Sequence, residues 1–158
     1  MFTPIPGMNL SCHIVDARHP HLTELIGKLD ADLLSRYEAS AIHGLDLSDP
    51  HIDRMLFAVI YAGDQPAGCG ALRPIDAETS ELKRFFVDAP FRRKGVAGTL
   101  LRFLEEAASE RGCRSVRLQT GVKQPEAIAL YAKHGYLRIN NFGPYADDPL
   151  SVCMEKSM

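Results

Sequence analysis

The spacing of apolar residues along the chain predicts a succession of strands and helices. Alternating or continuous apolar positions predict strands over residues 10–17, 55–62, 66–75, 81–87, 115–120, 136–139 and 150–155. Apolar residues three and four positions apart predict a helix over residues 21–37 and two later helices. The earlier of the two later helices follows residues 92–98 and ends at Gly112. The second has Pro125 in its first turn and ends at Gly135.

The order of these elements indicates the fold class. Three consecutive strands between residues 55 and 87 predict a meander, and the two later helices connect further strands to the same sheet. The run MLFAVIYA at residues 55–62 is continuously apolar, which is typical of a strand buried on both faces. We expect a single α/β domain over residues 1–158, with a mixed, mostly antiparallel sheet and helices on both faces. Residues 39–51 predict a loop or a short helical excursion.

Composition and charge are those of an ordinary globular protein. The formal net charge of −2 predicts no bulk attraction to nucleic acid, and no apolar run approaches a membrane span. The first ten residues lack a basic segment followed by an apolar one, so we expect no signal peptide. Four scattered cysteines without a CxxC motif predict reduced thiols in a cytoplasmic protein. The six histidines show no ligand spacing, and His19-Pro20-His21 indicates a helix entrance, so no metal site is expected.

The strongest chemical signal is a basic, glycine-containing segment between a predicted strand and a predicted helix. It consists of Arg92, Arg93, Lys94, Gly95, Val96, Ala97 and Gly98. Small residues let the backbone approach a phosphate, and the unpaired N–H groups of the first helical turn bind it at the positive end of the helix dipole. A solvated basic turn is the alternative. The segment matches neither G-x-x-x-x-G-K-(S/T) nor G-x-G-x-x-G, which argues against a nucleotide-phosphate domain.

Two segments together resemble the GNAT superfamily of acetyl-CoA-dependent N-acetyltransferases. Residues 92–97, RRKGVA, fill the family's signature (Gln/Arg)-x-x-Gly-x-(Gly/Ala). Residues 127–136, AIALYAKHGY, resemble its A-x-x-L-Y-x-(K)-x-G-(F/Y) pattern, in the right order and at the right distance. The resemblance covers the chain from residue 58 onward, whereas the first fifty residues match only in their strand–helix pattern.

The resemblance implies acetyl-CoA as the acetyl donor, with its pyrophosphate on residues 92–98. The pantetheine arm would pair with the backbone edge of the preceding strand at Phe85, Phe86 and Val87, while their side chains pack in the core. The strand over residues 115–120 would diverge from it and leave a cleft. Gln124 stands where many relatives carry a cofactor-binding asparagine, and its amide keeps the same hydrogen-bonding groups on a longer arm.

The resemblance also implies two catalytic residues. Tyr131 matches the tyrosine that donates a proton or a hydrogen bond to the departing thiolate, and the alternative is a core tyrosine. Glu81 lies eleven residues before Arg92, the offset at which several relatives carry the general base. The alternatives for Glu81 are a solvated strand-end charge paired with Lys83 or Arg73, and a water wire in place of a base. Protein N-terminal acetyltransferases of the family place a glutamate where Gln119 stands, which argues against that branch.

Acceptor-binding residues in this family come largely from the first helices and the loop after the last helix. Here these are residues 33–53 and 140–149, and Arg73 and Tyr145 are candidates for lining the acceptor site. The acidic residues of the first region, Asp46, Asp49 and Asp53, would suit a cationic acceptor, although solvated loop charges are the commoner explanation.

The expected activity is acetyl transfer from acetyl-CoA to a primary amine within a ternary complex. A small molecule or an amino acid is favoured as acceptor over a protein, and backbone N–H groups near Phe86 would stabilise the oxyanion. No cysteine is paired with a histidine in a known motif, which disfavours an acetyl-enzyme. The alternatives are a non-catalytic acyl-CoA-binding regulator and a protein lysine acetyltransferase. No nucleic-acid or membrane partner is expected, and a homodimer is left open.

Overall fold

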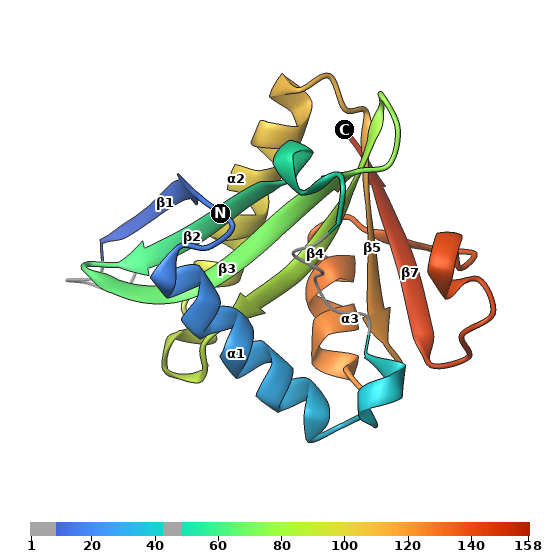
Figure 1. The fold of residues 1–158 in the computed structure, drawn as a ribbon, viewed down its shortest axis with the longest axis horizontal. Helices are drawn as coiled ribbons and strands as arrows, with labels where there is room; N and C mark the ends of the chain where they lie inside the picture. Colours follow the sequence, from blue (N-terminus) through green and yellow to red (C-terminus); the bar gives the residue numbers. More distant parts are fainter. Residues whose placement is uncertain (1–8, 43–48) are drawn as a thin grey trace.

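The computed structural model describes residues 9–42 and 49–158, which form a seven-stranded sheet with helices on both faces (Figure 1). Asp46, one of the acidic residues considered for the acceptor region, lies outside the described residues. The strands are β1 (Leu10–Val15), β2 (Leu56–Ala62), β3 (Gln65–Pro74), β4 (Thr79–Val87), β5 (Ser115–Gly121), β6 (Leu137–Ile139) and β7 (Ser151–Ser157). The α-helices are α1 (Pro20–Leu34), α2 (Val96–Glu110) and α3 (Pro125–Lys133). Short 3-10 turns cover Ala39–Ala41, Ile52–Arg54, Ala89–Phe91 and Gly143–Tyr145.

The strands lie in the order β1-β2-β3-β4-β5-β7-β6. All neighbouring strands run antiparallel except β4 and β5, which are parallel because α2 connects them. This arrangement confirms the predicted mixed, mostly antiparallel sheet and the element order.

The two faces of the sheet carry separate hydrophobic cores. Alternate residues of β2 point to opposite faces, as its continuous apolar run predicts: Phe57 and Val59 pack with α1, whereas Ala58 and Ile60 pack with α2 and α3. All four side chains are buried. β2 lies between β1 and β3 in the sheet and is covered on both faces (Figure 1).

The helix ends follow the glycine signals in the sequence. Gly112 after α2 and Gly135 after α3 have φ values of +89° and +94°, the left-handed conformation that ends many helices. α1 ends at Leu34, three residues before the predicted end at residue 37. Its last turn is closed by the Ser35 hydroxyl, which donates a 2.5 Å hydrogen bond to the Asp32 carbonyl. None of the helices in the described ranges is long and apolar enough to cross a membrane.

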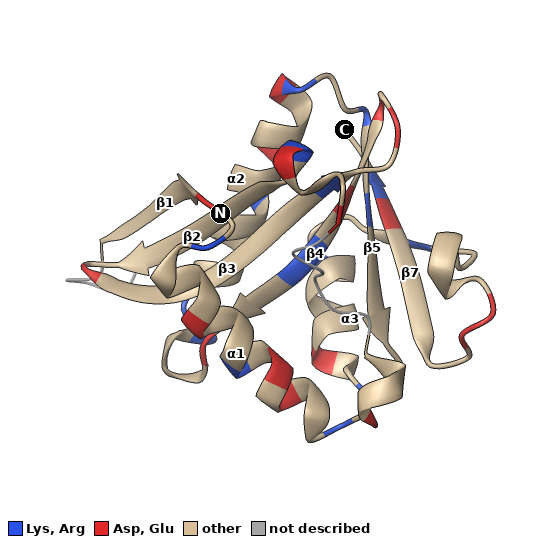
Figure 2. Ribbon diagram, in the orientation of Figure 1, with Lys and Arg blue, Asp and Glu red and all other residues tan. Residues whose placement is uncertain are grey.

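Strands β4 and β5 separate halfway along their length. Their pairing runs only from Thr79–Ser115 to Leu82–Leu118. Beyond that point, a bulge in β4 places Arg84 at a φ of +53° and shifts the register with β3. The bulge contains two basic residues, Lys83 and Arg84, and Figure 2 shows basic residues midway along β4. The expected divergence of these strands is therefore present.

Candidate active site

A cavity of about 110 Å³ opens where β4 and β5 separate. Its walls come from α1 and the segment after it, from β4, β5 and α3, and from the loop before β7. Its lining includes the following residues from the sequence analysis: Glu81, Phe85, Gln119, Gln124, Tyr131 and Tyr145. Segments from along the whole described chain therefore meet at one point of the sheet.

Glu81 is buried in this cavity and is not the solvated strand-end charge considered as an alternative. Its residue is 5% exposed. Tyr145 donates a 2.5 Å hydrogen bond from Oη to Glu81 Oε2, and Lys83 Nζ donates to Tyr145 Oη at 3.1 Å. Lys83 Nζ also lies 3.8 Å from Glu81 Oε2. Both neighbours therefore contact one oxygen of the carboxylate, and Oε1 has no hydrogen-bond donor among residues 9–42 and 49–158.

Arg73 lies outside the cavity lining. It pairs with Glu81 in the β3–β4 ladder, but its guanidinium Nε lies 3.2 Å from Asp49 Oδ2. Asp49 is one of the acidic residues considered for a cationic acceptor, and this ion pair neutralises its charge. Asp53, another, lies in the 3-10 turn Ile52–Arg54, outside this lining. Of the two acceptor candidates, the structure therefore places Tyr145 in the cavity lining and Arg73 outside it.

Tyr131 lies on the cavity wall and is held by aromatic neighbours. Its ring packs edge-on against Phe85 and Tyr136, with centroids 6.0 and 5.8 Å away. The residue is 7% exposed, and burial raises the pKa of Tyr131 far above its ordinary value. A phenol in this environment stays protonated, so it can donate a proton or hydrogen bond but cannot act as a base.

The basic glycine segment forms a backbone turn at the start of α2. Arg93 and Gly95 both have positive φ values, +62° and +80°. Gly95 is the N-cap of α2 and no side chain caps the helix, so the N–H groups of the first turn carry no side-chain acceptor there. No acidic residue lies in that first turn. This geometry fits an anion-binding turn better than an ordinary basic loop.

Arg92, Phe86 and Gly98, which lie before and after this turn in the chain, each make a specific contact. Arg92 Nε donates to the Val87 carbonyl at 2.9 Å, and its guanidinium lies 5.6 Å from the centroid of the Phe86 ring. Phe86 is buried in the core beside α1. A Cβ on Gly98 would approach His134 Cε1 to 3.0 Å, so this glycine allows α2 to pack closely on the end of α3.

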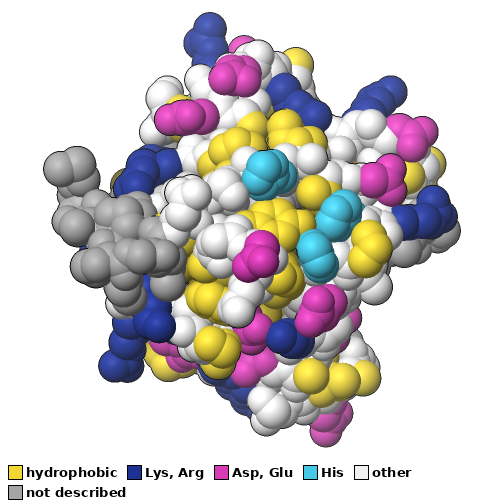
Figure 3. Space-filling model, turned by 90° about the vertical axis from the view of Figure 1, so that its left-hand side faces the viewer, with side chains coloured by type: hydrophobic (Ala, Val, Ile, Leu, Met, Phe, Trp, Pro, Cys, Tyr) yellow, Lys and Arg dark blue, Asp and Glu magenta, His cyan; other side chains and the backbone are white. Residues whose placement is uncertain are grey.

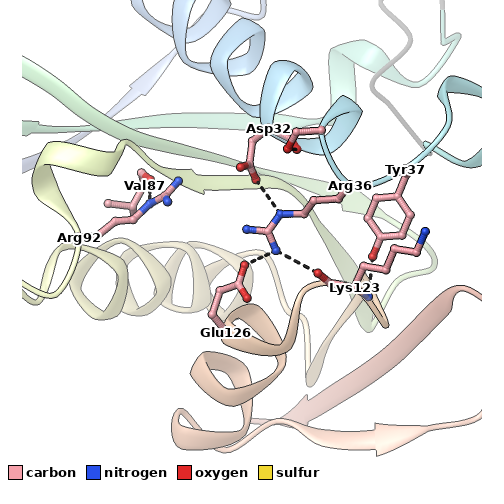
Figure 4. A network of polar contacts seen from close by, with 8 residues as sticks. Asp32, Arg36, Tyr37, Val87, Arg92, Lys123 and Glu126 are labelled. Atoms are coloured by element: carbon pink, nitrogen blue, oxygen red, sulfur yellow. Dashed lines mark hydrogen bonds and ion pairs between the residues drawn. The ribbon is translucent and has the colours of Figure 1, made fainter.

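A polar clasp, formed by Asp32, Arg36, Tyr37, Lys123 and Glu126, joins the end of α1 to the start of α3 (Figure 4). Arg36 forms ion pairs with Asp32 and Glu126 and donates to the Lys123 carbonyl at 3.0 Å. The Tyr37 hydroxyl accepts from the Lys123 N–H at 3.0 Å. A Cβ on Gly121 would lie 1.9 Å from Tyr37 Oη, so only glycine fits there. The clasp holds Tyr37 in the cavity wall.

Sequence reasoning missed several cavity residues. Tyr37, Arg84 and Asp148 line the cavity but belong to no motif that the sequence reveals. Asp148 Oδ2 accepts a 2.7 Å hydrogen bond from Ser151, which also receives one from Gln119. The sequence signal available for Asp148 was its position in the loop already assigned to acceptor binding. Tyr37 has the same kind of signal, since it lies within residues 33–53, which were also assigned to acceptor binding, whereas for Arg84 the sequence holds no comparable signal.

The four cysteines are free thiols, and none of their recorded hydrogen bonds involves a histidine. Burial raises the pKa of Cys69 to about 12 and that of Cys12 to about 11. The pKa of Cys153 is also raised, mainly by burial. Thiols in such environments are poor nucleophiles because little thiolate is present near neutral pH.

The histidines near the start of the chain gather on one face of the molecule (Figure 3). His21 Nδ1 lies 2.7 Å from the Tyr61 hydroxyl, and the His13 ring packs edge-on against the same tyrosine. His19 is the N-cap of α1 and accepts from the His21 N–H, which confirms the predicted helix entrance. In the part of the chain that the structure describes, no three His, Cys, Asp or Glu side chains are grouped to hold a metal ion.

Comparison with known proteins identifies the family of this chain. Residues 23–136 match the Acetyltransferase (GNAT) family. The chain belongs to this family. It is therefore a GNAT N-acetyltransferase, in agreement with the resemblance of residues 92–97 and 127–136.

Individual relatives share both the sequence and the fold of this GNAT chain. It is 38% identical over 139 residues to an IAA acetyltransferase of Azospirillum brasilense, covering 87% of this chain and 90% of that protein. A structure described as an acyl-CoA N-acyltransferase from Klebsiella pneumoniae is 33% identical, with a TM-score of 0.83 over 94% of this chain and 97% of the other. A GNAT acetyltransferase of Elizabethkingia anophelis, solved with acetyl-CoA bound, shares the fold at 19% identity, with a TM-score of 0.72 over 95% and 99%.

Proposed function

We propose that this enzyme transfers acetyl from acetyl-CoA to the primary amine of a small molecule, directly and in a ternary complex. The observation that carries the proposal is the presence of buried Glu81 and buried Tyr131 on the wall of one cavity, where β4 and β5 separate. One side chain can accept a proton and the other can donate one. Aminolysis of a thioester needs both functions.

The donor would bind along the edge of β4. Backbone N–H groups of residues 93–98 would bind the pyrophosphate, helped by the charges of Arg92, Arg93 and Lys94. The pantetheine arm would then pair with β4 along residues 85–87, where β5 has left the strand, and Gln124 would contact it from α3. The related fold from Elizabethkingia anophelis, whose structure contains acetyl-CoA, supports this assignment of the donor.

The chemistry follows from the groups on the cavity wall. The amine nitrogen attacks the thioester carbonyl, and Glu81 takes a proton from it through Oε1 or through one water molecule. The backbone N–H groups at the β4 bulge, near Phe86, would stabilise the oxyanion because Arg84 and Phe85 are outside the ladder with β3. When the tetrahedral intermediate collapses, the C–S bond breaks and Tyr131 donates to the leaving thiolate.

The size and chemistry of the cavity support a small acceptor and direct transfer. Its volume of about 110 Å³ is compatible with a small amine. Similarity to a protein named as an IAA acetyltransferase agrees with a small-molecule acceptor. The raised pKa values of the buried thiols argue against a cysteine-bound acetyl intermediate.

Thiol release from acetyl-CoA tests this proposal. We expect one or more members of a panel of small amines and amino acids to release thiol, whereas lysine-containing peptides should give lower rates. If acetyl-CoA raises the melting temperature but no amine releases thiol, the chain is an acyl-CoA-binding regulator and the proposed reaction is wrong. Faster acetylation of peptides than of small amines would instead favour a protein lysine acetyltransferase.

A further inference from the structure

Arg84 is the least satisfied charged residue of the cavity. Its side chain is only 4% exposed, and its Nε is buried without a hydrogen-bond partner among the described residues. Its one recorded partner is Asp30 of α1, whose own side chain is 48% exposed. A guanidinium has five N–H donors, and leaving a buried one unpaired is costly. Arg84 therefore retains a donor that a further acceptor atom could pair.

The bulge in β4 explains why this arginine lies beside the catalytic groups. In a regular strand, neighbouring side chains alternate between the two faces of the sheet. The left-handed conformation of Arg84 breaks this alternation, and Lys83, Arg84 and Phe85 all belong to the cavity lining. A bulky residue adopts this conformation only at a cost in free energy. The bulge bears this cost and places the guanidinium of Arg84 at the cavity.

The carboxylates of the cavity do not neutralise Arg84. Glu81 is engaged by Tyr145 and Lys83, as described above. Asp148 accepts from the Ser151 hydroxyl at 2.7 Å and from the Leu150 N–H at 3.0 Å. The lining thus contains an arginine whose one carboxylate partner among residues 9–42 and 49–158, Asp30, lies outside it. Asp30 balances the charge of Arg84, and a carboxylate on the ligand would supply a further acceptor for the guanidinium donors that Asp30 leaves unpaired.

We propose that the acceptor is a small amine that also carries a carboxylate, as an amino acid does, and that Arg84 binds this carboxylate while Glu81 receives the amine proton. The planar guanidinium matches a planar carboxylate and can donate two parallel hydrogen bonds to it. This inference rests on the proposed function and adds the class of acceptor. It replaces the cationic acceptor that the acidic residues near Asp49 suggested, since Asp49 is neutralised by Arg73.

Matched acceptors test the inference. L-phenylalanine, L-phenylalaninamide and phenethylamine differ mainly at the carboxylate, and rates are compared at equal concentrations of the free amine. The same comparison is made for glycine, glycinamide and methylamine. We expect kcat/KM to be at least about tenfold higher for the carboxylate-bearing member of each set that is acetylated, the effect expected of a hydrogen bond to a charged group. Equal rates within every set would overturn the inference while leaving the proposed function intact. Absence of thiol release with every amine would contradict both the inference and the proposed function.

Two substitutions separate ligand binding from a merely structural ion pair. Arg84→Met should lower kcat/KM for the carboxylate-bearing acceptor about 10- to 100-fold more than for the matched bare amine, so the preference for the carboxylate should disappear. Asp30→Asn removes the same ion pair but keeps the guanidinium, so it should preserve the preference for the carboxylate. If both variants lose the preference equally, Arg84 acts only through its ion pair and the inference is wrong.

A competition measurement keeps the inference testable if Arg84→Met does not fold. In the wild-type enzyme, 3-phenylpropanoate should inhibit competitively against an amino acid acceptor, and its uncharged amide should not. Arg84→Lys retains a positive charge and should keep part of this inhibition. Equal inhibition by the acid and its amide would contradict recognition of the carboxylate.

Discussion

Tyr145 donates a 2.5 Å hydrogen bond to Glu81 although the two residues are 64 positions apart in the chain. The contact joins the loop before β7 to the third residue of β4, and Lys83 completes it at 3.1 Å from the tyrosine hydroxyl. It fixes one oxygen of the carboxylate, and the other receives no recorded hydrogen bond from the described residues. A tyrosine proposed from sequence to line the acceptor site therefore also orients the proposed base.

Replacement of Tyr145 tests that relationship. Tyr145→Phe removes a hydrogen bond to a buried carboxylate, so the free energy of unfolding should fall by about 1.5–3 kcal/mol. kcat/KM should fall as well, because Glu81 loses its fixed orientation. Denaturant unfolding and steady-state rates measure both effects. The matched control is Tyr61→Phe, which removes a 2.7 Å contact with His21 and should leave kcat/KM unchanged. Equal loss of activity in both variants would contradict the prediction.

Replacement of Tyr131 separates cofactor binding from chemistry. We expect Tyr131→Phe to keep the affinity for acetyl-CoA and to lower kcat by about 10²-fold, the lower end of general acid catalysis, because the CoA thiolate is a tolerable leaving group. Rapid-mixing kinetics establish that chemistry limits the rate. Because Phe keeps the ring contacts with Phe85 and Tyr136, the melting temperature serves as the internal control. An unchanged kcat would leave Tyr131 as a core residue.

The N-terminal turn of α2 is tested by adding charge at its glycine. Gly95→Asp places a carboxylate where the phosphate should bind, so acetyl-CoA should no longer raise the melting temperature. Gly112→Asp introduces the same strain and charge at the other end of α2, where φ is +89°. We expect this control to be destabilised but to keep its response to acetyl-CoA. If both variants lost the melting-temperature response to acetyl-CoA, a specific role of Gly95 in phosphate binding would be contradicted.

Stability should decline at alkaline pH because of buried tyrosines. Burial is the largest cause of the raised pKa values of Tyr37, Tyr131, Tyr136 and Tyr145. The folded state thus retains protons that the unfolded chain releases near the ordinary tyrosine pKa of 10.0. Their stabilisation is fully present below that pH and is lost as pH rises above it. The melting temperature should fall steeply above about pH 10, and a constant value across that range would contradict the burial of these phenols.

Much of the fold could be predicted because its signals are local. The glycines after α2 and α3 and the continuous apolar run of β2 each determine their structure within a few residues. The candidate site is harder to predict from the sequence because it depends on contacts between distant segments. The bulge at Arg84 comes from a register shift against β3, and the clasp at Tyr37 depends on the absence of a side chain at Gly121. Arg73 was placed near the acceptor on its position alone, since its pairing with Asp49 cannot be read from either residue.

The pH dependence of kcat/KM in Glu81→Gln tests the central claim most directly. If Glu81 takes the amine proton, the variant should lose most activity near neutral pH, and the loss should shrink as pH rises and the amine deprotonates unaided. Glu155→Gln, which alters a carboxylate paired with Arg117 on the same sheet, serves as the control and should keep the wild-type profile. A loss in Glu81→Gln that is independent of pH, or a profile identical to wild type, would contradict the account and leave a solvent-connected water wire as the route for the proton.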